Sequence, residues 1–133
     1  HVDKFNERTI KDVKDIVFNN VGFTDSAAEV LLAIFDEIPK LERVKMPNNK
    51  IGDSGMRHIL MAPAMQGGLL ELDLSQNQLK SLPQKLEAST ELRSIFLSGN
   101  KITNFTSGIE LLKTLSIEYL ILSKNKMVKL RLH

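Results

Sequence analysis

The chain is 133 residues long, 42% of its residues are hydrophobic, and it contains no cysteine, which fits one globular domain without disulfide bonds. The formal net charge of +2 excludes the strong positive field typical of nucleic-acid-binding proteins, and no run of 18 apolar residues is present that could cross a membrane. We therefore expect no nucleic-acid or membrane partner, and the lack of cysteine favours an intracellular location, cytoplasmic or nuclear. One N-glycosylation tripeptide, beginning at Asn104, points the other way.

An eleven-residue pattern occurs five times along the chain. It is clearest in LLELDLSQNQL at residues 69–79, where apolar residues stand at positions 1, 4, 6 and 11 and asparagine at position 9. The first copy, VKDIVFNNVGF, has Val21 at position 9. Internal repeats of this kind predict a stack of similar units that share one core. The copies begin near residues 13, 41, 69, 92 and 117, and the last four carry Asn49, Asn77, Asn100 and Asn125.

Each copy is expected to form one short strand followed by a return segment. Positions 4 and 6 flank a single residue, so both side chains point to the same side of an extended chain, which we interpret as the core side. Each buried leucine or isoleucine stabilises the fold by roughly 1.5–3 kcal/mol, and stacking makes the apolar faces continuous. Parallel strands are predicted near residues 15–18, 43–46, 71–74, 94–97 and 119–122.

The N-terminal half of the chain predicts three helices. Residues 1–12, with Phe5 and Ile10, can form a short helix that caps the stack. Two longer helices are predicted at about 26–37 and 54–62. An Asp-Ser pair, typical of helix N-caps, begins each of them, and a proline follows each.

The later copies have shorter return segments. LKSLPQKL at 79–86 predicts an extended or 3-10 return, and residues 109–114 predict one short helix. Only six residues follow Met127, too few for another repeat. The chain is therefore expected to be a fragment of a longer protein or to associate end to end. The residues expected at such a contact are Leu120, Leu122, Leu130 and Leu132.

The asparagines at position 9 have a structural interpretation. A turn inside an apolar core leaves backbone donors and acceptors without partners, and a carboxamide offers both a donor and an acceptor. Stacked asparagines are therefore expected to form a hydrogen-bonded ladder. Val21 lacks this chemistry, which predicts an atypical, capping-like turn in the first copy.

The pattern L-x-x-L-x-L-x-x-N-x-L, over residues 13–127, resembles that of the leucine-rich repeat family. This resemblance implies an α/β solenoid with about five short parallel strands on a concave face and helices or 3-10 turns on the convex face. It implies a single domain over residues 1–133. The first two copies, 28 residues apart, resemble the ribonuclease-inhibitor type of repeat, and the shorter copies resemble the phosphatase-regulator and dynein-light-chain type.

The same resemblance implies a non-catalytic protein–protein interaction module, a scaffold that binds a partner on its concave face. Two alternatives stay open. Ran GTPase-activating proteins use the longer repeat type, which would make the chain an accessory regulator of a small GTPase. The leucine-rich repeat subunit of a spliceosomal particle shares the shorter type, which would make it a subunit of an RNA–protein particle.

The sequence shows no constellation typical of catalysis. It has no Gly-rich phosphate loop, no metal-ligand spacing and no nucleophile with a neighbouring base. His58, in the second of the longer helices, is interpreted as a half-buried packing residue. We expect no enzyme activity, no cofactor and no metal site.

Positions 3 and 5 of each copy should face away from the core, onto the concave surface. On the first three strands opposite charges are expected side by side, Asp15 with Arg43, Arg43 with Glu71, and Lys45 with Asp73. These charges either form a solvated ladder that sets strand register or select a partner. On the last two strands an exposed apolar cluster either binds a partner or packs on further C-terminal sequence. The predicted partner-binding residues are Arg43, Lys45, Glu71, Asp73, Phe96, Tyr119 and Ile121.

Overall fold

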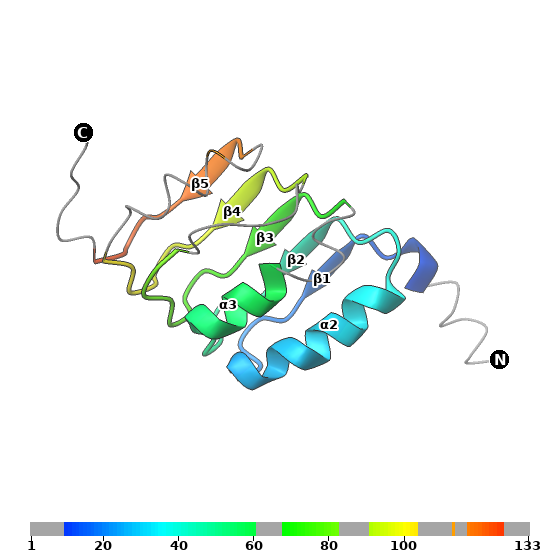
Figure 1. Ribbon diagram of the computed structural model, residues 1–133, viewed down its shortest axis with the longest axis horizontal. Coiled ribbons are helices and arrows are strands. Elements are labelled where there is room, and N and C mark those ends of the chain that lie inside the picture. The colour runs from blue at the N-terminus through cyan, green and yellow to red at the C-terminus, as the bar shows by residue number, and fades with distance from the viewer. Residues whose placement is uncertain (1–9, 61–67, 83–90, 104–112, 114–116, 127–133) are drawn as a thin grey trace.

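Five parallel strands form one sheet in which each strand pairs with the next along the chain. The predicted strands are confirmed, each inside its expected range (Figure 1). They are β1 (Asp15–Val17), β2 (Arg43–Lys45), β3 (Glu71–Asp73), β4 (Ser94–Phe96) and β5 (Tyr119–Ile121). The computed structural model of the protein describes residues 10–60, 68–82, 91–103, 113 and 117–126.

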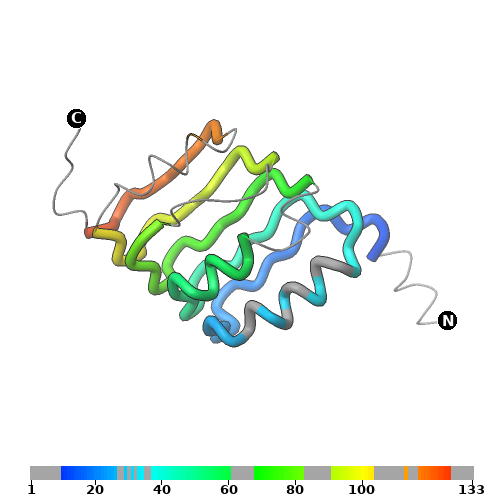
Figure 2. Tube along the Cα trace, in the orientation of Figure 1, coloured from blue at the N-terminus to red at the C-terminus, as the bar shows by residue number. Residues whose placement is uncertain are grey.

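Helices cover one face of this sheet beside its first strands (Figure 1). A 3-10 turn, η1 (Asp25–Ala27), leads into α2 (Ala28–Glu37), and α3 (Asp53–Leu60) packs beside α2. Both helices predicted for the long copies are confirmed where the structure describes the chain. Figure 2 shows the successive turns side by side in sequence order, an arrangement compatible with an α/β repeat fold.

Several predicted features fall partly or wholly outside the described residues. The described part of the predicted N-terminal helix, residues 10–12, is helical, and so is Lys113 in the predicted short helix. The features outside are residues 1–9 with Phe5, residues 61–62 of the second long helix, the return segment after Leu82, the rest of the 109–114 helix, Asn104, Leu130 and Leu132.

The core is built from the four apolar positions of the pattern. In the three inner copies these side chains are at most 5% exposed, as predicted. Ile16 of β1 and Leu120 of β5 are only half-buried, because each of these edge strands has a neighbouring strand on one side only. The helices add Leu31 and Ile59 to the same core. The buried pattern residues are Leu41, Val44, Met46, Ile51, Leu69, Leu72, Leu74, Leu79, Leu92, Ile95, Leu97 and Ile102.

The asparagines at position 9 form the predicted ladder, and each one bonds to the copy before it. Asn77 Oδ1 accepts a hydrogen bond from the Ile51 N–H (3.0 Å), and its Nδ2 donates to the Met46 carbonyl oxygen (2.9 Å). Ile51 and Met46 both belong to the preceding copy. The same amide also donates to the Leu74 carbonyl of its own copy (3.0 Å). Equivalent bonds are made by Asn49, Asn100 and Asn125.

The direction of the ladder explains the exception at Val21. An amide at position 9 makes hydrogen bonds to backbone groups of the copy before it. The described sheet begins with the copy that contains Val21, so no earlier copy in this sheet needs such an amide. The Val21 N–H itself donates to Asn49 Oδ1 (3.1 Å) in the second copy. The first copy therefore receives the hydrogen bonds of the ladder without supplying an amide of its own.

Position 8 of every copy adopts the left-handed backbone conformation, which sequence reasoning missed. The φ angles lie between 55° and 69° and turn the chain inward just after each strand. The N–H of this residue then bonds the carbonyl at position 7 of the next copy, as from Gln76 to Ser98 (2.8 Å). The sequence did contain a signal for this turn, because position 8 is asparagine or glycine in three of the five copies and these residues tolerate the left-handed conformation. The five residues are Asn20, Asn48, Gln76, Gly99 and Lys124.

The two aspartates expected to cap α2 and α3 bond to the following copy as well. Asp25 Oδ1 accepts a hydrogen bond from the Gly52 N–H, and Asp53 Oδ1 accepts one from the Lys80 N–H (2.9 Å). Stacking places the N–H groups of the next copy beside these helix starts. The aspartates therefore join neighbouring copies, a role that the simple N-cap prediction did not include.

Candidate functional site

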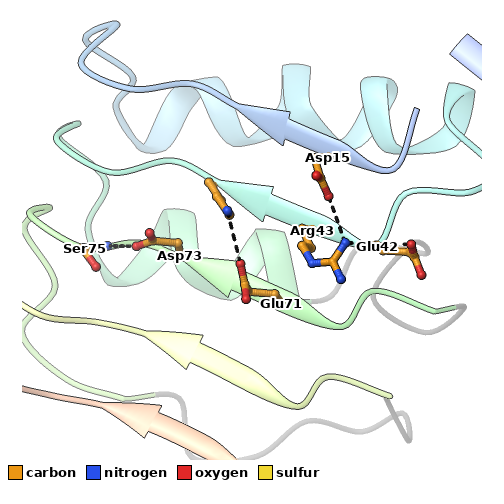
Figure 3. Close-up of polar contacts among 7 residues, drawn as sticks. Asp15, Glu42, Arg43, Glu71, Asp73 and Ser75 are labelled. Carbon is orange, nitrogen blue, oxygen red and sulfur yellow. Dashed lines mark hydrogen bonds and ion pairs between the residues drawn. The ribbon is translucent and has the colours of Figure 1, made fainter. Parts of the chain in front are cut away.

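The sheet face opposite α2 and α3 presents the side chains at positions 3 and 5; we call it the open face. Along β2, β3 and β4 a buried residue lies between two half-exposed ones, which confirms that position 4 points to the core and positions 3 and 5 point away. Figure 3 shows Asp15, Arg43, Glu71 and Asp73 in front of the strands, with helices behind. All seven predicted partner-binding residues stand at these positions.

Strand register brings the predicted neighbours together. Asp15 lies opposite Arg43, Arg43 lies opposite Glu71, and Lys45 lies opposite Asp73. The register continues across the other strands, so that Phe96 lies between Asp73 and Ile121. The open face is therefore charged over β1 to β3 and largely apolar over β4 and β5.

The first ion pair on the open face joins β1 to β2. Arg43 Nη1 donates a hydrogen bond to Asp15 Oδ1 (3.2 Å) and lies 4.0 Å from Glu42 Oε1 (Figure 3). The hydrogen bond to Asp15, followed by the charge of that carboxylate, raises the pKa of Arg43 above its ordinary value. Exposed pairs of this kind contribute about 0–1 kcal/mol, so this one positions side chains more than it stabilises the fold.

The second ion pair differs from the prediction. Lys45 Nζ lies 3.7 Å from Glu71 Oε2, and the carboxylate of its register neighbour Asp73 instead accepts a hydrogen bond from the Ser75 N–H (2.9 Å). The shorter aspartate side chain bonds the turn directly after its own strand, as aspartates commonly do. The longer glutamate reaches diagonally across to the lysine. Lys45 and Asp73 therefore lie side by side as predicted, but the ion pair forms between Lys45 and Glu71.

The apolar part of the open face contains the predicted cluster of Phe96, Tyr119 and Ile121. Tyr119 is 59% exposed and Ile121 is 38% exposed, and both are on β5. Phe96 is half-buried and lies opposite Ile121. The exposure of Tyr119 and Ile121 agrees with the prediction, whereas Phe96 is less exposed than predicted. The use of the cluster in binding stays a prediction.

The described residues hold no group of three or more histidine, cysteine, aspartate or glutamate side chains that could bind a metal ion. His58 is exposed on α3, so the predicted half-buried packing role is wrong. Its neighbours Ile59 and Leu60 occupy the buried side of the helix. Across the described ranges, no helix has the length and apolar character needed to cross a membrane.

The chain is similar in sequence to fibromodulins. The bovine (Bos taurus) protein is 37% identical over 68 residues, which is 51% of this chain and 16% of the relative. The human (Homo sapiens) protein is 35% identical over 72 residues, or 54% of this chain and 18% of the relative, and the chicken (Gallus gallus) protein is 35% identical over 72 residues, or 54% and 17%.

The matched region covers less than a fifth of each of these relatives. No family model matches the chain, and no solved structure matches it. The similarity to fibromodulins supports a leucine-rich repeat relationship for about half of the chain, in agreement with the repeated pattern and the parallel sheet.

Proposed function

We propose that the chain is a non-catalytic module that binds a protein partner on the open face. The observation that carries this proposal is the apolar cluster, in which Tyr119 and Ile121 are exposed on β5 and the half-buried Phe96 lies opposite Ile121 on β4. Exposed apolar patches with charged neighbours are typical of contact sites, and aromatic residues commonly dominate their binding energy. The leucine-rich repeat relationship supports the same function.

The backbone beneath the open face supports binding without rearrangement. The strands are joined by their own ladder, by hydrogen bonds before and after each strand, and by the buried asparagines. A surface held in this way loses little conformational entropy when a partner binds. The strands can therefore present the cluster to a partner from a fixed backbone.

The central test is the removal of the exposed aromatic ring. We expect Tyr119→Ala to weaken partner capture by about 1–2 kcal/mol, because the ring is an exposed anchor, and to leave thermal unfolding nearly unchanged, because the ring packs little on the core. Phe96→Ala should weaken capture by a similar amount. The measurement is quantitative mass spectrometry of proteins captured from the source cell by the immobilised parent and variants, with unfolding followed by circular dichroism.

The matched control is Arg57→Ala, because Arg57 is exposed on α3, on the helix-covered side of the sheet. A photo-crosslinking amino acid placed at 119 and at 57 should label the captured partner from residue 119 alone. Equal capture by the parent and Tyr119→Ala, or equal labelling from both positions, would show that the open face is not the binding site.

A further inference from the structure

The open face carries more acidic than basic side chains, and Asp73 is the acidic side chain that has no ion-pair partner among the described residues. Five of the ten side chains at positions 3 and 5 are charged. Arg43 pairs with Asp15, and Lys45 pairs with Glu71. Asp73 makes no ion pair in the part of the chain that the structure describes, and Glu42 adds another carboxylate beside Arg43.

The position of the Asp73 carboxylate is fixed by its own copy. Its Oδ1 accepts the hydrogen bond from the Ser75 N–H, and within the described residues Oδ2 has no partner (Figure 3). The side chain is half-buried, so its charge is partly removed from water. A partly desolvated carboxylate that makes no ion pair, because the lysine opposite it is paired with Glu71, favours the approach of a further positive group.

Asp73 also lies at the border of the apolar cluster. It is the register neighbour of Phe96, which in turn is opposite Ile121. Neighbouring strands lie about 4.8 Å apart, so the cluster begins about 5 Å from Asp73 and extends to about 10 Å. Two residues separated by one in an extended segment, or three to four apart on a helix, span a comparable distance.

We propose, on the basis of the function proposed above, that the partner is a protein segment carrying a lysine or arginine next to an apolar anchor. The basic side chain pairs with Asp73, and the anchor packs on Phe96, Tyr119 and Ile121. Acidic segments and nucleic-acid phosphates are disfavoured, because they would place negative charge beside Asp73. The cation therefore selects the partner, and the anchor supplies most of the binding energy.

The test uses peptides selected from a random library of about 12 residues displayed on phage, with the whole chain as the target. We expect the enriched peptides to contain an aromatic or aliphatic residue within four positions of a lysine or arginine. One such peptide is then synthesised, and its affinity is measured by fluorescence anisotropy for the parent and for Asp73→Asn. This variant removes the charge and keeps an oxygen that can accept the Ser75 N–H bond.

Asp73→Asn should weaken binding of this peptide about threefold to tenfold and reduce the dependence of its affinity on salt. Glu29→Gln, which removes one exposed acidic charge on α2, is the matched control and should bind like the parent. Enriched peptides without basic residues, or equal affinity for the parent and Asp73→Asn, would overturn the inference. If Tyr119→Ala still weakened binding, the proposed function would stand. Peptides that bind without depending on either residue, or no enrichment at all, would overturn both.

Discussion

At the scale of the residue, the buried asparagine at position 9 connects each copy of the repeat to the copy before it. Asn77 is 6% exposed, and its amide bonds two backbone groups of the preceding copy and the Leu74 carbonyl of its own. A backbone turn in an apolar core would otherwise leave these groups without partners, at a cost of about 1–3 kcal/mol. The amide therefore makes the turn compatible with burial.

We expect Asn77→Ala to lower the free energy of unfolding by about 2–3 kcal/mol, because the Ile51 N–H and the Met46 carbonyl lose the Asn77 amide while remaining buried. The measurement is urea denaturation followed by circular dichroism. The control is Gln78→Ala, at an exposed neighbouring position, which should change the free energy by less than about 0.5 kcal/mol. Equal effects of the two substitutions would contradict the role of the ladder.

At the scale of the element, helix α3 is shaped by contact with the preceding copy as well as by its own sequence. Gly55 lies near the start of α3 and is buried. A Cβ atom at this position would lie 2.9 Å from Ile51 Cγ2 and 3.1 Å from Asp25 Cα. Close packing between η1 and α3 therefore requires glycine here, although glycine is a poor helix former.

This close approach reverses the usual effect of replacing a helical glycine. Helix propensity alone predicts that Gly55→Ala stabilises the protein by about 1 kcal/mol. We expect it instead to destabilise the protein by about 1–3 kcal/mol, because the methyl group would overlap the side chains of Asp25 and Ile51 and make a tight contact with the Asp25 backbone. The measurement is the melting temperature in thermal unfolding, and the control is Ser54→Ala, a substitution at the adjacent exposed position. A higher melting temperature for Gly55→Ala than for the parent would contradict this packing argument.

At the scale of the whole molecule, the sheet is most tightly packed in its middle. Leu72 of β3 is fully buried between two neighbouring strands, whereas Leu120 of β5, at the equivalent position, is half-buried. Repeat stacks gain stability from contacts between neighbouring units, so an edge unit depends on one interface and an inner unit on two. Stability should therefore fall from the centre of the described sheet toward β5.

We expect Leu72→Ala to lower the free energy of unfolding by about 3–4 kcal/mol and Leu120→Ala by about 1 kcal/mol. The first leaves a cavity in the core, and the second removes a side chain that is already partly in water. Urea denaturation measures both, and backbone hydrogen exchange should show slower exchange in β3 than in β5. A larger effect at Leu120 than at Leu72 would mean that β5 is an inner part of the packed structure.

The sequence alone determined the number of strands, their register and the core. These features follow from the spacing of apolar residues, because a two-residue alternation on a short strand decides which side chains are buried. The seven candidate binding residues were placed on one face by the same alternation. Their neighbours across the sheet followed from the alignment of the copies, since equivalent positions of stacked copies lie side by side.

Only the tertiary structure decided which polar groups bond to each other. Lys45 pairs with Glu71, and Asp25 bonds the Gly52 N–H, because side-chain length and the turn groups of the next copy determine what each charge can reach. The repeat pattern fixes where these side chains begin, but their partners exist only after the copies have stacked. Stacking also decides that Asp73, on which the proposed selection of a basic partner depends, makes no ion pair among the described residues. A turn of its own copy holds one carboxylate oxygen, and Lys45 of the neighbouring strand pairs with Glu71 instead.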